Sequence, residues 1–412
     1  IRGCNFTMNK KENSWMGICP GLIALAFLAA IFFYPVVSFQ AALSGLNIFL
    51  QSVFPALLPF FICSEVMIGL GMVDLLSVLL NPVMKPIFRC PGSSSFVWTM
   101  SITSGYPTGA RLTSELCKQK RITSHEAQRI LSFCSTSGPL FMVSAVGIGM
   151  LGSAEAGRII LISHYLAALL TGFAFRFYKS RDYLPSRSLE AYKHKPDVRS
   201  HQIKSKNSKI RVNNIHEARN ALLTARKNDG RHIGQLMGDA VRNSVNTLLV
   251  VGGFIIFFSV IIAIIMLWFD HPQFKLLAGG LFEVTTGSKL ISKSALSIQA
   301  KIAVISFMIG WSGLSIHAQS ASLLSGTGVR MDIFMLGKLL HGLLSAALSI
   351  PIGRFIYPEV QNVSVPPPVM IIPEWKEVLL SSFRLMLLAF LLLALFALTV
   401  RITLWVRKKA AF

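Results

Sequence analysis

The sequence predicts an all-α polytopic membrane protein with about seven to eight spans, in two repeated halves that each contain a re-entrant helical hairpin. Three observations support this fold class. Only 14% of the 412 residues are charged, whereas a soluble domain carries about 25% charge. No charged residue lies between Glu12 and Glu65, a length that crosses a ~30 Å hydrocarbon core twice. Polar, glycine-containing breaks also interrupt later apolar segments.

The apolar segments are continuous rather than alternating, which favours helices over an outer-membrane barrel. Further charge-free windows follow the first one, at 90–110, 130–154, 159–175, 243–269, 302–329 and 385–400. Each can hide its backbone polar groups from lipid only by forming helix. The predicted spans therefore run along most of the chain.

The first half begins with a tail and a first span in residues 1–45. The span covers about Trp15–Val37 and is expected to end near Tyr34-Pro35. A first repeat then covers 46–178 and opens with a span at Leu46–Val73, which prolines kink. Its apolar segment 96–116 is broken at the centre by Ser104-Gly-Tyr-Pro-Thr-Gly109. We interpret this segment as a hairpin of two half-helices with a polar tip.

A basic segment separates the two halves. Residues 179–231 contain fourteen Lys and Arg against five acids, so we interpret 179–242 as a cytoplasmic loop under the positive-inside rule. Such a loop attracts anionic lipid headgroups. A nucleic-acid site is not expected, because no aromatic residues interleave with the basic ones.

The second repeat covers 243–350, with its hairpin at 302–324 broken around Ser312–His317. Residues 351–412 supply a proline-rich loop, a last span and a basic tail. An offset of 208 positions superposes Ser104-Gly105 on Ser312-Gly313, although only eight positions of 104–140 are identical. The order of segments supports the repeat better than the identities do. The basic residues near the second hairpin predict that it faces the cytoplasm, whereas an inverted repeat would place it on the outer side of the membrane. We favour the inverted arrangement.

The breaks supply the candidate substrate-binding residues. Glycine and proline inside an apolar segment leave backbone groups that need a partner, a cavity or a ligand. The N-termini of half-helices carry partial positive charge and suit an anion. The candidates are Ser104, Gly105, Tyr106, Pro107, Thr108, Gly109, Arg111, Ser135, Thr136, Ser137, Gly138, Glu283, Thr285, Thr286, Gly287, Ser312, Gly313, Ser315 and His317. Tight packing of small residues is the competing interpretation.

Ionisable residues inside spans are expected to be paired or functional. Arg111 is expected to pair an anion, and Glu283 to bind a coupling proton or sodium ion. Glu65 is a weaker candidate because its side chain could reach an interface, and Lys338 and His341 are weaker because they could lie at a helix surface. No catalytic motif or nucleotide-binding loop is present, and the six cysteines lack metal-ligand spacing. We therefore expect no enzyme activity, no metal and no bound cofactor.

Four ordered motifs carry a family resemblance. Val53-Phe-Pro-Ala-Leu-Leu-Pro-Phe-Phe61, Ser104–Ala110, Ser135–Pro139 and Glu283–Gly287 resemble those of the YlbJ-type sporulation integral membrane proteins. The resemblance implies two copies of the nucleoside-recognition, or gate, domain and an architecture similar to concentrative nucleoside transporters. It also implies a place in the outer forespore membrane, or the cell membrane, of a spore-forming bacterium.

The resemblance further implies transport of dipicolinic acid, a small planar dianion, toward the forespore. Two alternatives stay open: a nucleoside or nucleobase carrier, and a spore-envelope assembly protein that transports nothing. The expected partners are the small anionic solute, the bilayer and the headgroups at 179–231, without nucleic acid. Whether the chain forms a homo-oligomer also stays open.

Overall fold

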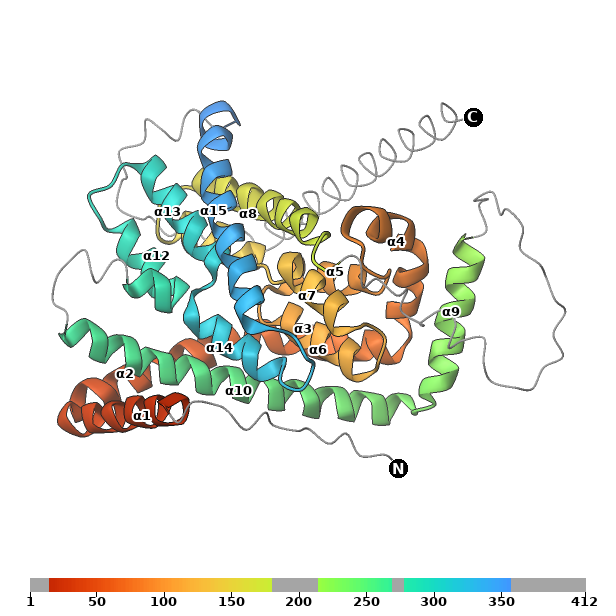
Figure 1. Cartoon of the computed structure of the whole chain (residues 1–412), viewed down its shortest axis with the longest axis horizontal. Helices are drawn as coiled ribbons and strands as arrows, with labels where there is room; N and C mark the ends of the chain where they lie inside the picture. Colours follow the sequence, from red (N-terminus) through yellow and green to blue (C-terminus); the bar gives the residue numbers. More distant parts are fainter. Residues whose placement is uncertain (1–14, 180–213, 269–277, 357–412) are drawn as a thin grey trace, which may run out of the picture.

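The structure is a computed structural model, and it describes residues 15–179, 214–268 and 278–356. The regular elements of these ranges are helices, as predicted (Figure 1). In chain order they are α1 (Trp15–Phe33), α2 (Pro35–Ile48), the π-helical turn η1 (Phe49–Val53), α3 (Phe54–Gly69), α4 (Met72–Phe88), α5 (Ser94–Ser104), α6 (Thr108–Lys118), α7 (Ser124–Cys134), η2 (Leu140–Ile148), α8 (Ala154–Phe175), α9 (Asn214–Asp229), α10 (Ile233–Trp268), α12 (Val284–Ser292), α13 (Ile298–Trp311), α14 (Gly313–Leu323) and α15 (Met331–Ile356).

Four segments of the described chain are long and apolar enough to cross a membrane: Ala154–Phe175, Ile233–Trp268, Ile298–Leu323 and Met331–Phe355. Two bent helix pairs raise the number to six if each pair is one span. The tail 1–14, most of the basic loop (180–213) and the proline-rich loop with the last span (357–412) lie outside the described residues. The predicted seven to eight spans therefore stay a prediction.

The first N-terminal helix ends at a proline, as the sequence predicted. Residues Gly21–Phe33 and Pro35–Gln51 meet at an angle of 103°. Tyr34 leaves the helical conformation (φ −122°, ψ 56°) and Pro35 begins α2, as expected for a residue that precedes proline. Helix then continues from α2 through η1 into α3. The predicted end of the first span near Tyr34-Pro35 is therefore confirmed. The chain is helical from Pro35 to Ile48, so helix also covers the interval left between the first two predicted spans.

The first predicted break is confirmed, and the second is a break without a hairpin. Helix α5 ends at Ser104, just before Gly105 with φ 78°, and α6 begins at Thr108. The two helices contact each other. Helices α13 and α14 are separated only by Ser312, at φ 77°. They count together as one span, Ile298–Leu323. The hairpin expected at 302–324 is corrected to a broken but continuous span, because the left-handed residues Ser312 and Gly313 (φ 77° and 75°) interrupt the helix without reversing the chain.

The two halves share a core. One apolar cluster joins residues of η2 and α8, such as Met142 and Ile160, to residues of α13, such as Ile305 and Ile309. Helix α15 packs against both α8 and α13. At Gly310 an added Cβ would lie 2.5 Å from the Cα of Gly342, so α13 and α15 cross at backbone contact. Residues before and after the basic loop therefore form one packed body.

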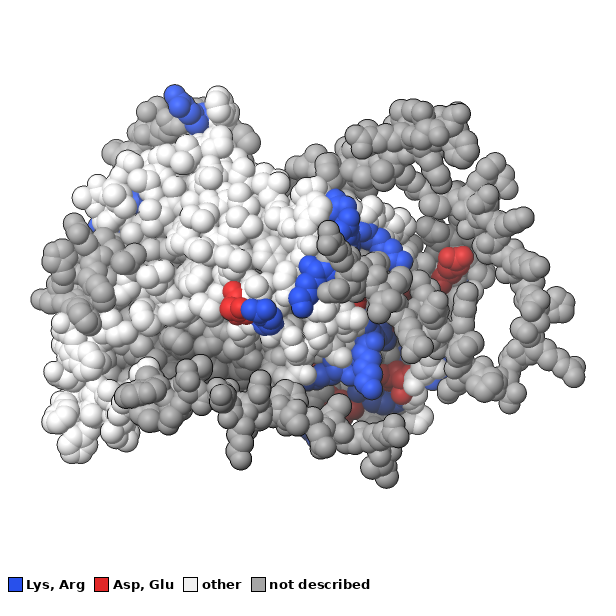
Figure 2. All heavy atoms as spheres, viewed as in Figure 1, with Lys and Arg blue, Asp and Glu red and all other residues white. Residues whose placement is uncertain are grey.

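Charge is unevenly distributed over the surface. Figure 2 shows a largely uncharged face over the part that holds α2, α12, α13 and α15, while most of the visible Lys, Arg, Asp and Glu gather toward α4, α6 and α9. Large apolar side chains such as Phe32, Phe33 and Phe39 are at least 70% exposed on α1 and α2. An uncharged surface with exposed aromatic rings is suited to lipid rather than to water.

Candidate functional site

In the first half, the two predicted polar breaks pack directly against each other. A Cβ added at Gly105 would lie 2.7 Å from the amide nitrogen of Gly138, and one at Gly109 would lie 2.1 Å from the carbonyl oxygen of Cys134. The Ser101 hydroxyl donates to that same carbonyl. The glycines are needed because two irregular backbones approach closely here. The Ser104–Gly109 run and the Ser135–Gly138 run therefore form one unit.

In the second half, the break before α14 contacts the break before α12. A Cβ added at Gly313 would lie 2.9 Å from the carbonyl oxygen of Phe282, and the Trp311 indole donates to the Leu281 carbonyl at 3.2 Å. Glu283 caps α12, because its carboxylate accepts the amide hydrogens of Thr285 (2.9 Å) and Thr286 (2.6 Å). The predicted 283–287 and 312–313 runs are thus adjacent.

Tyr106 lies between these two pairs of breaks. Its hydroxyl oxygen is buried and forms no hydrogen bond with the described residues. The hydroxyls of Ser137 and Ser312 and the carboxylate of Glu283 lie close enough to act on it electrostatically. One aromatic side chain from the first half therefore brings polar groups of both halves to the same place.

Lys338, on α15, adds a buried cation to this place. Its ammonium donates to the Ser135 carbonyl oxygen at 2.6 Å and lies 5.8 Å from the centre of the Tyr106 ring. The side chain is 1% exposed. No carboxylate of the described ranges forms an ion pair with it. A buried charge without a counter-charge is costly, so Lys338 provides a ready partner for an anion.

Two histidines extend the cluster from Lys338. The Nζ of Lys338 lies 3.5 Å from the Nδ1 of His341, and the Nε2 of His341 lies 2.9 Å from the carbonyl oxygen of His164. The two imidazole centroids are 4.4 Å apart. The Ser137 amide donates to the Nε2 of His164 at 3.0 Å. Helices α8 and α15 therefore hold both rings against the first-half break.

Several buried polar atoms around these groups have no hydrogen-bond partner among the described residues. They include the hydroxyls of Ser135, Thr136 and Ser345, the Nδ1 atoms of His164 and His317, and the Oε1 of Gln319. An unpaired polar atom in an apolar interior costs about 1–3 kcal/mol. Such a concentration is typical of a region that admits water or a polar solute.

Arg111 is held away from the cluster. Its guanidinium forms an ion pair with Glu65 on α3 and donates to the Ser64 hydroxyl at 3.2 Å. It also stacks over the Phe61 ring, with its Cζ atom 4.7 Å from the ring centre. Arg111 and Glu65 were predicted as two separate candidate functional residues, and in the structure they form an ion pair with each other.

The remaining candidates take local partners. Ser104 donates to the Thr108 hydroxyl at 2.7 Å, and the peptide bond between Tyr106 and Pro107 is cis. His317 bonds to the Trp311 carbonyl through its Nε2 at 2.8 Å. Ser315 accepts from the Gln319 amide at 3.3 Å. A Cβ added at Gly287 would lie 2.4 Å from the Cα of Gly280, which makes Gly287 a packing residue.

A known protein matches the chain over most of its length. Over 357 residues it is 38% identical to the sporulation integral membrane protein YlbJ of Bacillus subtilis (strain 168), and the match covers 82% of this chain and 83% of the relative. The chain belongs to the YlbJ family. Residues 50–154 match the Gate family model, described as nucleoside recognition. No solved structure matches the chain.

As a YlbJ-family member, the protein is an integral membrane protein linked to sporulation. The Gate match runs from η1 to the start of α8. It includes both first-half breaks, Arg111 and Glu65, but not Lys338 or the histidines of α8 and α15. The second gate domain that the resemblance implies stays a prediction.

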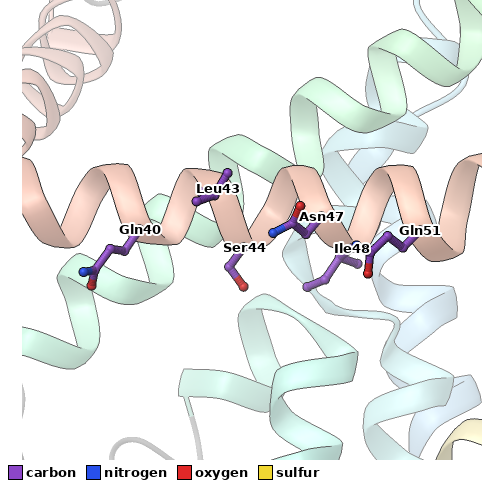
Figure 3. Close-up of a pocket in the computed structure, with 6 residues that line it drawn as sticks. All are labelled: Gln40, Leu43, Ser44, Asn47, Ile48 and Gln51. Carbon is purple, nitrogen blue, oxygen red and sulfur yellow. The ribbon is translucent and has the colours of Figure 1, made fainter.

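A hollow of about 380 Å³ lies elsewhere on this YlbJ-family chain, along α2 and η1 (Figure 3). It is lined by Gln40, Leu43, Ser44, Asn47, Ile48 and Gln51. The four polar residues are exposed and recur at helical spacing on one face. The hollow therefore offers amide donors and acceptors but no charge.

Sequence reasoning missed two features. His164 lies within the charge-free window 159–175, and an ionisable side chain inside a span is itself a sign of function. The second feature is the row of polar residues Gln40, Ser44, Asn47 and Gln51, here called the α2 stripe, and its helical spacing could have been noticed in the sequence. Attention to glycine breaks alone left both features out.

Proposed function

We propose that this YlbJ-family protein carries a small anionic solute, dipicolinic acid, across the outer forespore membrane. The observation that carries the proposal is Lys338, a fully buried ammonium without a carboxylate partner in the described chain. A carboxylate of the solute would supply the missing counter-charge. The contacts of Lys338 with Ser135 and Tyr106 support this assignment, because they connect it to the polar breaks.

The unpaired polar atoms around Lys338 support a polar, planar guest. Hydroxyls of Ser135, Thr136 and Ser345 can donate to carboxylate oxygens. The Tyr106 ring offers an aromatic face, and its buried hydroxyl offers another donor. Because Lys338 and His341 are at most 1% exposed, the described conformation is closed around them. Access requires the helices to part, as alternating access demands.

Arg111 is not assigned to the solute in this proposal. Its ion pair with Glu65 already neutralises it, whereas Lys338 lacks such a partner. Glu283 is likewise occupied, since its carboxylate caps α12. The proposal therefore places anion recognition on α15 and the first-half breaks.

A nucleoside carrier is the second candidate, and a specific observation favours it. The Gate model is described as nucleoside recognition, and the α2 hollow is lined by Gln40, Asn47 and Gln51. Amides can pair with the edge of a neutral base without any charged group. In that case the α2 hollow, not Lys338, would bind the solute.

Titration calorimetry on the purified, detergent-solubilised chain separates these candidates. Dipicolinate and uridine are titrated into the wild type, into Lys338→Met and into the control Lys118→Met, whose side chain is exposed on α6. We expect dipicolinate to bind the wild type and the control, and to lose at least tenfold in affinity with Lys338→Met. Binding of uridine alone, or equal dipicolinate affinity in all three proteins, would overturn the proposal.

A further inference from the structure

Backbone contacts fix the protons on the two buried histidines. His341 faces a carbonyl oxygen through its Nε2, so that nitrogen must carry a hydrogen to bond. Its Nδ1 is then the free lone pair, and it faces the ammonium of Lys338 at 3.5 Å. The Nε2 of His164 accepts the Ser137 amide, so the proton of this neutral ring is on Nδ1. In the empty site, both imidazoles are therefore neutral, and the Lys338 amine beside them donates to the Ser135 carbonyl.

The charge balance changes when a dianion enters. With Lys338 alone protonated, the site carries one positive charge and a bound dicarboxylate would leave one net negative charge inside the membrane. Unbalanced charge at that depth is expensive. A second proton on the Nδ1 of His341 would give two positive charges against two negative ones. In the empty site, this second proton is opposed by the neighbouring ammonium of Lys338.

We propose that His341 takes up one proton when the dianion binds next to Lys338, so that the solute crosses the membrane together with a proton. The proton is delivered by hydronium from the aqueous phase: its O–H bond breaks, an N–H bond forms at Nδ1 of His341, and a water molecule is released. His341 keeps its Nε2 hydrogen bond to the His164 carbonyl, and its new N–H donates to a carboxylate of the solute. This inference rests on the proposed function and adds the coupling ion.

The other titratable groups near Lys338 and His341 bond to other partners or offer no proton acceptor beside Lys338. The Tyr165 hydroxyl of α8 bonds to the carbonyls of Ile102 and Ser137, and Tyr106 keeps its phenolic proton. His317 is bonded to Trp311, and Glu283 caps α12. On α7, the Glu126 carboxylate accepts the Thr123 amide hydrogen and Arg129 donates to the Arg89 carbonyl. The Cys134 thiol, also on α7, lies in an apolar cluster. On α13, Lys301 donates to the Ser292 carbonyl.

The test counts protons taken up on binding. Dipicolinate is titrated into the full chain at one pH, in buffers that differ in ionisation enthalpy, and the dependence of the heat on the buffer gives the number of protons. We expect about one proton per dianion for the wild type, together with about tenfold tighter binding per unit fall in pH over the range of uptake. This pH dependence needs no variant.

His341→Gln keeps a donor for the His164 carbonyl but cannot take up a proton. We expect it to bind dipicolinate with proton uptake near zero and with affinity that is flat with pH. The control His216→Gln, exposed on α9, should keep the wild-type uptake. Binding by the wild type without proton uptake, or unchanged uptake in His341→Gln, would overturn the inference and leave the proposed function standing. Absence of binding by the wild type would overturn both.

Discussion

The Arg111 guanidinium on α6 forms an ion pair with the Glu65 carboxylate on α3, and the two side chains are 8% and 17% exposed. Removing one partner leaves the other charge buried and unpaired, which costs about 3 kcal/mol or more. We therefore expect Arg111→Leu to lower the thermal unfolding temperature of the detergent-solubilised protein markedly. The double variant Glu65→Leu/Arg111→Leu should recover most of the loss.

The same double variant decides whether Arg111 contacts the solute. If the ion pair is structural, dipicolinate affinity in the double variant should stay within a few-fold of the wild type in titration calorimetry. A loss of tenfold or more in a protein of normal stability would return Arg111 to the binding site. Equal stability of the single variant, the double variant and the wild type would contradict the structural role of the pair.

Gly109 marks the contact between the two first-half breaks. A Cβ there would lie 2.1 Å from the Cys134 carbonyl oxygen, whereas nothing lies within 4 Å of one added at Gly253 on α10. Overpacking of this kind typically costs 1–3 kcal/mol. We expect Gly109→Ala to lower both unfolding temperature and dipicolinate binding, and Gly253→Ala to change neither. Equal effects of the two substitutions would show that the close packing of the breaks is unimportant.

The loop before α10 contains a pH-dependent ion pair. Arg231 donates to both carboxylate oxygens of Asp229, at 3.0 and 2.7 Å, and this hydrogen bonding lowers the pKa of Asp229. Because the folded-state pKa is the lower one, the stabilisation is present above about pH 4 and is lost as pH falls through the folded-state pKa.

Asp229→Asn tests this pH dependence. The two side chains are partly exposed, at 32% and 18%, so solvent weakens the pair. We therefore expect the variant to be less stable than the wild type by under about 1 kcal/mol at pH 7. The difference should shrink on acidification and in high salt. Thermal unfolding measured at pH 7 and pH 3 checks this. A difference that is constant, or that grows as the pH falls, would contradict the assignment.

The α2 stripe provides a test of the second candidate function. Replacing Gln40, Asn47 and Gln51 with Leu removes the amides that line the hollow and leaves Lys338 untouched. If the solute is an anion bound at Lys338, dipicolinate uptake into vesicles should stay within about twofold of the wild type. Uridine uptake by the wild type that disappears in this triple variant would favour the nucleoside carrier instead.

Sequence patterns predicted the helical fold and the main breaks well, because both follow from local chemistry. A glycine or proline inside an apolar run has few conformational options in lipid, so the interruption at Ser104–Gly109 could be located directly. The bend at Tyr34 was also encoded locally, since the residue before proline disfavours helix. The course of the chain beyond Ser312 could not be predicted in this way, because the sequence of a break does not say whether the next helix turns back or continues.

The pairing of ionisable residues could not be predicted from their positions. Arg111 and Glu65 are far apart in the sequence, and only the packing of α6 against its neighbours brings them together. Lys338 looked like a surface residue because one turn of helix does not reveal which face is covered. Its burial depends on α8 and the break at Ser135, which lie about 200 positions earlier in the chain. The offset that suggested the repeat gave no sign of this contact.

The most direct test is uptake of labelled dipicolinate into lipid vesicles that contain only this protein, compared between the wild type, Lys338→Met and Lys118→Met. We expect the wild type and Lys118→Met to accumulate the label at similar rates, and Lys338→Met to insert normally but lose at least nine-tenths of the rate. Failure of the wild-type vesicles to take up dipicolinate, or full uptake with Lys338→Met, would contradict an anion carrier built around Lys338.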